Sequence, residues 1–294
     1  MSFILKNKVI ELHVDDPLKQ YKFPRFDWTG KITTVKYKGL LVSGNEKTHP
    51  EEIKTFGRGF YNEFGISMPI GFKEIKKNQW FPKIGVGSLK KDSDDYYFLN
   101  NYEIKPANFS IDYSENRIQL GCTSKNENGY AYELEKEITL LDDGFQVSYN
   151  LLNTGEKPII TTEYNHNFIA INNNLIGKDY RLSFDFDLDK KVFDEIVNPN
   201  DVVTIDSEQI SFNTQPESDF FFSNISGGKT VKAKWLLKDY KNKIAISEEA
   251  SFTTNYINIW GCGHVISPEL FIALNILPGE RKSWFRRYSI SDFS

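Results

Sequence analysis

The chain has 294 residues, of which 39% are hydrophobic and 26% are charged. This composition allows a sizeable buried core, so the chain is neither disordered nor fibrous. Its formal net charge of -4 gives no electrostatic reason to bind nucleic acid or an anionic membrane.

No segment approaches the roughly 18 consecutive apolar residues that a membrane-spanning helix needs. The first residues also lack the apolar region of a secretion signal. We therefore expect a soluble, cytoplasmic protein with no membrane or nucleic-acid partner. We expect it to be a monomer or a homodimer.

Apolar and polar residues alternate along most of the chain, which indicates β-strands. The alternation is clearest over residues 130–168, where turn residues at 142–144 and 154–158 separate three strands. We predict a three-stranded antiparallel meander there. Similar patterns recur, in chain order, over residues 3–14, 32–42, 109–124, 180–188, 202–212, 230–237, 244–249, 256–260, 269–277 and 283–290.

Helical patterns are short and scarce, and the best are residues 50–54 and 191–196. Residues 44–83 form the main irregular insertion. Many short strands without long helices indicate an all-β sandwich or barrel, and no linker or internal repeat divides the chain. We predict a single domain over residues 1–294, built from two large packed antiparallel sheets.

His166 is the most informative of the four histidines. Alternation places it on the same strand face as Tyr164 and Phe168. Two interpretations stay open: a buried core histidine, or a general acid or base, since an unperturbed pKa of about 6.5 suits proton transfer near neutral pH. Glu163 and His166 have the spacing of a helical metal-binding pair, but they diverge on a strand, so we predict no metal site.

Glu269 begins a predicted strand and shares a face with Phe271. It is either a surface carboxylate or a base in a cleft. With a reference pKa of about 4.3 it would be ionised while His166 is partly protonated, so the two would supply a base and an acid together.

Arg58 lies between two glycines in a segment rich in aromatic residues. The glycines permit close approach, and a planar guanidinium suits a polyhydroxylated or anionic ligand. The alternative is a structural arginine that pairs with Glu63 or with a backbone carbonyl.

The strand over residues 162–168, which contains Asn165 and His166, resembles the Asn-His-x-aromatic segment of the aldose 1-epimerase (galactose mutarotase-like) superfamily. Residues 267–288, with a Pro-Gly-Glu turn before the last strand, resemble its closing strands. The similarity in strand order and length extends over essentially the whole chain. It implies a large antiparallel β-supersandwich with few short helices, a single domain that binds a small-molecule sugar in an open cleft.

The resemblance also implies site residues. His166 would protonate the ring oxygen and Glu269 would take the proton from the anomeric hydroxyl, with no metal or cofactor. The superfamily's other usual histidine has no counterpart here, and by order we predict that Lys83 supplies a hydroxyl donor in its place. Arg58 is placed by order as a substrate-binding residue. Aromatic faces beside the acid and the base would stack on the apolar face of a sugar ring, and Trp260 is a candidate for this contact.

We therefore expect an isomerase of carbohydrate metabolism that interconverts the α and β anomers of a free hexose. One alternative is a mutarotase for a hexose 6-phosphate, with Arg58 and Lys83 on the phosphate. Another is a noncatalytic carbohydrate-binding protein, because a fold does not fix a function. A polysaccharide lyase or hydrolase has less support, since the sequence singles out no matching Tyr or carboxylate pair.

Overall fold

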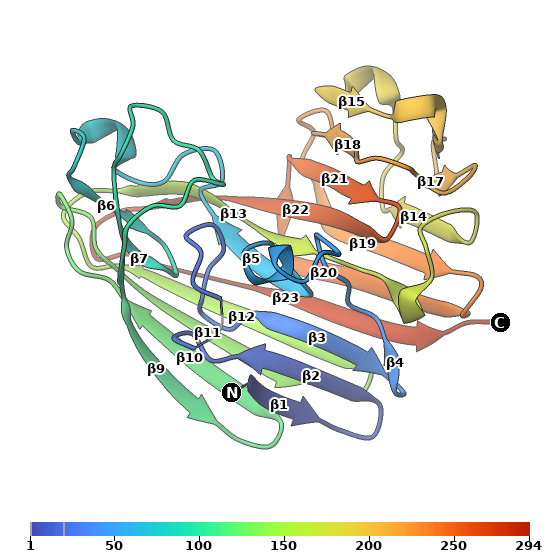
Figure 1. Ribbon diagram of the computed structural model, residues 1–294, viewed down its shortest axis with the longest axis horizontal. Helices are drawn as coiled ribbons and strands as arrows, with labels where there is room; N and C mark the ends of the chain where they lie inside the picture. Colours follow the sequence, from blue (N-terminus) through green and yellow to red (C-terminus); the bar gives the residue numbers. More distant parts are fainter. Residues whose placement is uncertain (1, 20) are drawn as a thin grey trace.

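The computed structural model describes residues 2–19 and 21–294. Within these residues it has the predicted all-β architecture, with two large antiparallel sheets and a small third sheet (Figure 1). Its helices are short 3-10 turns. No helix in the described part of the chain is long and apolar enough to cross a membrane.

The first sheet contains, in spatial order, β1 (Ser2–Lys6), β2 (Ile10–Asp15), β3 (Ile32–Tyr37), β5 (Phe60–Phe64), β13 (Ile159–Asn167), β22 (Val265–Ile276), β21 (Ile257–Cys262), β18 (Phe220–Ser223) and β15 (Glu195–Val197), with β4 (Leu40–Leu41) beside β3. The second contains β16 (Val203–Ile205), β17 (Gln209–Phe212), β14 (Tyr180–Phe184), β19 (Val231–Asp239), β20 (Ile244–Thr254), β23 (Arg281–Asp292), β12 (Gly144–Asn153), β11 (Tyr132–Leu140), β10 (Arg117–Thr123) and β9 (Asn108–Tyr113). The third contains β6 (Trp80–Lys83), β7 (Gly87–Lys90) and β8 (Ile104–Pro106). The 3-10 turns are η1 (Glu52–Lys54), η2 (Phe72–Glu74), η3 (Ile171–Asn173), η4 (Lys190–Val192) and η5 (Pro199–Asp201).

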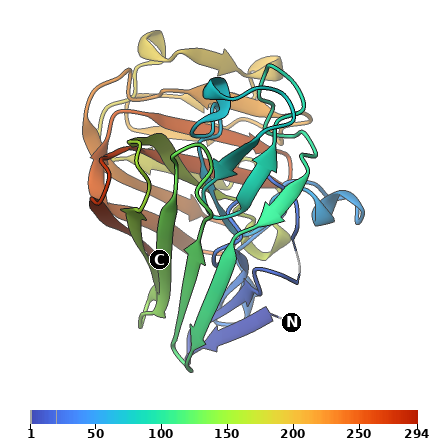
Figure 2. The same ribbon diagram turned by 90° about the vertical axis from the view of Figure 1, so that its left-hand side faces the viewer.

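The main hydrophobic core includes side chains from both large sheets. Along β11 the side chains of Leu134 and Ile138 are buried while Glu133 and Glu135 are exposed, as alternation predicts. At one side of the molecule the edge strands β9 and β1 lie side by side (Figures 1 and 2), and the Tyr113 hydroxyl donates a hydrogen bond to a backbone carbonyl of β1. The two sheets therefore meet at these edges.

The predicted meander is wrong in its third strand. β11 and β12 form a hairpin in the second sheet, but β13 pairs with β5 and β22 in the first sheet, and β12 pairs instead with β23. The turn at 154–158 thus carries the chain from one sheet to the other. Alternation shows that a segment is a strand, but it does not identify the strand's partners.

The irregular insertion predicted over residues 44–83 is also partly wrong, because it contains β5 and β6. All five residues of β5 are buried, so its sequence does not alternate between apolar and polar residues. The helix expected at 50–54 is present as η1. The one expected at 191–196 is only the turn η4, which is followed by the start of β15.

The ladder between β13 and β22 opens near one end. It runs from Ile159↔Ile276 to Tyr164↔Phe271 and is resumed by a single bridge at Ile169↔Ile266. In between lies Pro268, which has no N–H to donate to β13. The Asn167 side chain bridges the interval instead, since its amide nitrogen donates to the Pro268 carbonyl at 2.7 Å.

Candidate active site

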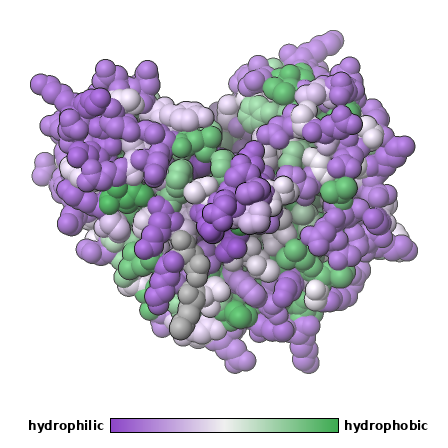
Figure 3. Space-filling view, in the orientation of Figure 1, coloured by the Kyte–Doolittle hydropathy of each residue, from purple (hydrophilic) through white to green (hydrophobic). Residues whose placement is uncertain are grey.

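A pocket of about 360 Å³ lies in the hollow between the two lobes of the molecule (Figure 3). Continuing the register of β13 and β22 by two residues past Tyr164↔Phe271 places His166 opposite Glu269, and both side chains line this pocket. Its other lining residues are Arg25, Glu46, Lys47, Phe56, Ile66, Phe98, Leu99, Tyr164, Asp219, Phe221, Asn258 and Trp260. Half of these fourteen lining residues are apolar or aromatic, and the other half carry polar or charged groups.

His166 and Glu269 are in direct contact at the base of the pocket. The His166 Nε2 atom lies 3.2 Å from Glu269 Oε1, and each residue is only 4% exposed. Ser267 lies two residues before Glu269 on β22 and places its Oγ atom 2.6 Å from His166 Nδ1 and 3.4 Å from Glu269 Oε1. The imidazole also stacks on Phe168, with ring centroids 4.0 Å apart. Both ring nitrogens and the ring plane of His166 are therefore fixed.

Burial changes the protonation of this pair from that expected at reference pKa values. Loss of hydration raises the pKa of Glu269 to about 8. The same effect, reinforced by the charge of Arg25, lowers the pKa of His166. Near neutral pH the two groups thus favour the neutral forms, a carboxylic acid and an imidazole, over the charged forms predicted from the sequence. Both forms of the pair hold one titratable proton, which lies on Glu269 in the neutral form and on His166 in the charged form.

Arg25 is a site residue that the sequence analysis missed. Its Nη1 atom donates to Glu46 at 2.9 Å and its Nε atom to Glu63 at 3.2 Å. The guanidinium lies between the rings of Phe26 and Phe98, 4.3 and 4.7 Å from their centroids. Its Nη2 atom has no hydrogen-bond partner within residues 2–19 and 21–294. Because Arg25 lines the pocket, we expect these N–H groups to be available to a ligand oxygen.

Arg58 lies elsewhere, which corrects its predicted position beside His166 and Glu269. Its Nη2 atom is 3.6 Å from Asp15 Oδ1, and it lines a separate pocket with Asp15. The expected alternative partner, Glu63, pairs instead with Arg25. Arg58 was expected in this site from its order along the chain. That order does not show which pocket the segment faces.

Lys83 is likewise placed behind the pocket, not in it. It is 1% exposed, and its Nζ atom donates to the Phe64 carbonyl at 2.7 Å, to the Tyr96 hydroxyl at 3.2 Å and to Glu63 at 3.4 Å. These three partners use all three of its N–H groups. The predicted role as a hydroxyl donor to the substrate is therefore replaced by a structural one. The Glu63 carboxylate, which also accepts from Tyr164 at 2.8 Å, connects Lys83 to Arg25.

Trp260 lines the pocket, where the sequence analysis expected it. Its ring meets that of His166 edge to face, with centroids 5.5 Å apart. Asn258 lies on the same strand as Trp260 and opposite Glu269, Asp219 immediately precedes β18, and both add polar groups to the pocket. Neither of these two has a local sequence signal, because β18, β21 and β22 come together only in the folded sheet. Arg25 does have one, since it lies among aromatic residues as Arg58 does.

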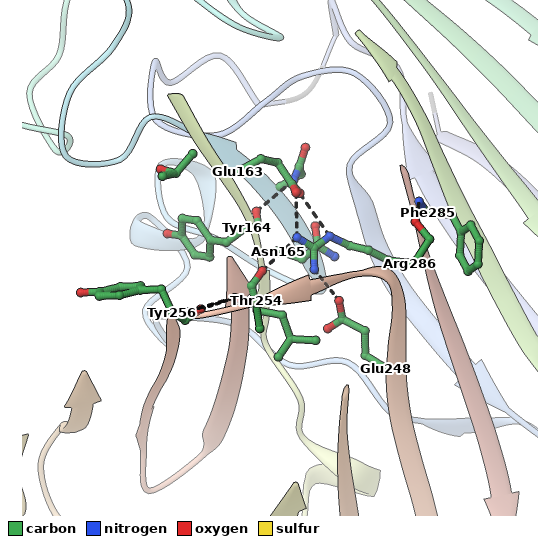
Figure 4. Close-up of polar contacts among 12 residues, drawn as sticks. Glu163, Tyr164, Asn165, Glu248, Thr254, Tyr256, Phe285 and Arg286 are labelled. Atoms are coloured by element: carbon green, nitrogen blue, oxygen red, sulfur yellow. Dashed lines mark hydrogen bonds and ion pairs between the residues drawn. The ribbon is translucent and has the colours of Figure 1, made fainter. Parts of the chain in front are cut away.

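The far face of β13 carries a buried charge network that supports the site. Glu163, Asn165 and Asn167 point away from His166, as alternation predicts. Arg286 on β23 lies between Glu163 and Glu248, at 2.7 and 2.6 Å, and also donates to the backbone carbonyl of residue 270 on β22 (Figure 4). This one guanidinium therefore connects the strand that carries His166 to the strand that carries Glu269.

Comparisons with known proteins place the fold. Scans against protein-family models and against curated proteins find no match. Solved structures do match, and three of them cover nearly the whole of this chain. A putative aldose 1-epimerase from Escherichia coli K12 has a TM-score of 0.64 and 10% identity, covering 100% of this chain and 99% of that one. A galactose mutarotase-like protein from Clostridium acetobutylicum has a TM-score of 0.62 and 11% identity, covering 99% and 95%.

A galactose 1-epimerase from Lactobacillus acidophilus NCFM has a TM-score of 0.55 and 12% identity, covering 100% of this chain and 95% of that one. The fold is therefore the galactose mutarotase-like β-sandwich. At identities of 10–12%, these matches show the shared fold.

Proposed function

We propose that this chain is a mutarotase-like isomerase that interconverts the α and β anomers of a free, unphosphorylated hexose. The observation that carries the proposal is the 3.2 Å contact between His166 Nε2 and Glu269 Oε1 in a pocket. The ring oxygen and the anomeric hydroxyl of a pyranose are bonded to the same carbon. An acid and a base this close together can therefore reach both oxygens of one sugar.

The reaction begins when the sugar displaces the direct contact between the two side chains. His166 then gives a proton to the ring oxygen while Glu269 takes the proton of the anomeric hydroxyl, so the bond between the ring oxygen and the anomeric carbon breaks. This step uses the charged form of the pair. In the neutral form Glu269 is the acid and His166 the base. Rotation about the bond between C1 and C2, followed by the reverse proton transfers, closes the ring on the other face.

The polar residues of the pocket favour a neutral sugar. Glu46, Asp219 and Glu269 bring carboxyl groups to it and Lys47 brings one ammonium group, while the Arg25 charge is already paired with Glu46 and Glu63. The predicted phosphate clamp is not assembled, since Arg58 and Lys83 lie outside this pocket. The hexose 6-phosphate alternative therefore has little support. Trp260 offers an apolar face for the sugar ring, and Asp219 and Asn258 offer partners for hydroxyl groups.

The test is the rate at which fresh α-D-glucose and α-D-galactose reach anomeric equilibrium, followed by polarimetry and anomer-resolved NMR. We expect the protein to exceed the buffer rate for at least one of them. Loss of the acid–base pair in Glu269→Gln should lower the catalysed rate by about 10² to 10⁴-fold. Glu249→Gln is the matched control, because the Glu249 side chain is 66% exposed and lies on another sheet.

The same measurements distinguish the remaining alternative. Sugar binding without acceleration would identify a noncatalytic carbohydrate-binding protein. If Glu269→Gln were as fast as Glu249→Gln on every sugar that the protein accelerates, Glu269 would not be the catalytic group.

A further inference from the structure

A second pocket, here called the lateral pocket, is lined by Asp15, Tyr21, Ile53, Lys54, Arg58 and Tyr61 and has a volume of about 300 Å³. Tyr61 on β5 stands opposite His166 on β13. The Phe26 ring lies between them, 5.3 Å from the Tyr61 ring and 6.3 Å from that of His166. The lateral pocket is thus a neighbour of the candidate active site, and the two have no lining residue in common.

The lateral pocket contains polar groups whose hydrogen bonds are incomplete. Asp15 is 2% exposed, and within residues 2–19 and 21–294 its Oδ2 atom has no hydrogen-bond partner. The buried Tyr21 hydroxyl has none either in that part of the chain. Buried polar atoms in proteins are nearly always hydrogen-bonded. These two unpartnered atoms belong to side chains that line the lateral pocket, and rotation of either side chain would present its atom to a bound molecule.

The charges of the lateral pocket favour a neutral ligand. The Arg58 guanidinium lies 3.6 Å from the Asp15 carboxylate, and the Lys54 ammonium lies 3.1 Å from Glu51. An anion would meet Asp15, and a cation would meet Arg58. A sugar hydroxyl both donates and accepts hydrogen bonds, so it can use the carboxylate, the guanidinium and the tyrosine hydroxyls together.

We propose that the lateral pocket is an accessory carbohydrate site, which binds one neutral hexose unit separately from the pocket of His166 and Glu269. Arg58 is then a sugar-binding residue, but at this second site. The volume is at the lower end of the range for small-molecule pockets, roughly 300–1,000 Å³. This is sufficient for a monosaccharide and not for a long polymer segment.

Calorimetric titration with D-glucose and D-galactose tests the proposal in the full chain. In the wild-type protein we expect two binding events. Trp260→Ala weakens the one in the candidate active site and should leave the other. Two further substitutions are then added to Trp260→Ala. Arg58→Ala removes a guanidinium donor, and Ile53→Trp fills the lateral pocket from its partly exposed rim. Each should weaken the remaining sugar binding at least tenfold. Thermal melts verify that each variant is folded.

The proposal is overturned if Trp260→Ala abolishes all sugar binding, or if Arg58→Ala and Ile53→Trp leave the remaining isotherm unchanged. It is also overturned if inorganic phosphate, and neither sugar, binds in an Arg58-dependent manner. Failure of the proposed isomerase activity would be seen in the anomer measurements alone. Sugar binding that depends on Arg58 would survive that result, so the two proposals can fail independently.

Discussion

At the scale of single residues, burial determines which protons the candidate active site holds. A carboxyl group transferred from water into the base of a pocket loses hydration that favours its charged form. Glu269 therefore keeps its proton to a pKa of about 8, and His166 resists gaining one. Ser267 adds geometric control, since a hydroxyl 2.6 Å from His166 Nδ1 fixes the orientation of the ring.

The raised pKa of Glu269 has a consequence for stability. The folded state binds this proton more tightly than the unfolded state, whose carboxyl group has its ordinary pKa of 4.5. The stabilisation is therefore fully present below pH 4.5 and is lost as the pH rises through about 8. Glu269→Gln removes the ionisation. We expect its melting temperature to exceed that of the wild type by a margin that grows from pH 5 to pH 8, reflecting at most a few kcal/mol.

Thermal melts of both proteins at pH 5, 6.5 and 8 measure this margin. Glu249→Gln is again the control, because it makes the same substitution at an exposed carboxyl group on the other large sheet. A margin that is constant with pH, or that shrinks toward pH 8, would contradict the assigned direction of the pKa shift.

Sequence reasoning identified part of the site at this scale. His166 and Glu269 could be proposed because strand alternation, aromatic neighbours and the family resemblance point to them, and Trp260 because an aromatic face suits a sugar ring. The structure brings the three together in one pocket. Arg25 could not be placed, because its function in the site depends on Glu46 and Glu63, which only the fold brings near. For the same reason the sequence predicted a contact between Lys83 and the ligand, whereas in the structure Lys83 contacts Glu63.

At the scale of elements, β13 and β22 make the site by separating where their ladder is interrupted. Pro268 lacks the N–H that would continue the ladder, and the side chain of Asn167 replaces that contact. On the opposite side of β13, Arg286 binds Glu163 and Glu248. These contacts hold the two strands in place on either side of the interruption in their ladder, where His166 and Glu269 stand opposite each other.

Removal of Arg286 should be strongly destabilising. Arg286→Leu would leave Glu163 and Glu248 buried without their cation, a change that typically costs about 3–5 kcal/mol. The neighbouring Arg287 is a matched control, because its side chain is 50% exposed and it pairs with Asp143 at 3.4 Å. Arg287→Leu should change the free energy of unfolding by about 1 kcal/mol or less.

Urea denaturation of the two variants and the wild type compares these costs. Similar free energies of unfolding for Arg286→Leu and Arg287→Leu would show that the buried network does not hold the strands. Addition of Glu163→Gln to Arg286→Leu should recover part of the loss, since one uncompensated charge is then removed.

Sequence patterns predicted the number and type of elements better than their pairing. The strands with one exposed face, such as β11, alternate and were found. β5, which is buried along its whole length, does not alternate and was missed. The partners of β13 depend on contacts between segments about 100 residues apart in sequence. No local pattern contains that information.

At the scale of the whole molecule, the two large sheets share one hydrophobic core. Its members extend from Leu5 on β1 to Ile290 on β23, and each sheet covers the apolar face of the other. We therefore expect the chain to behave as one domain and to unfold in a single cooperative transition. Differential scanning calorimetry should show one peak, with calorimetric and van't Hoff enthalpies that agree. Two resolved peaks would instead divide the chain into separately folding parts.

The near-complete enclosure of His166 and Glu269 fits a reaction that consumes nothing from the surroundings. In the proposed cycle, ring closure reverses both proton transfers and returns each proton to the group from which it came. The side chains end a turnover as they began it, whichever anomer entered. A site of this kind needs no proton exchange with bulk water between turnovers, in either direction of the reaction.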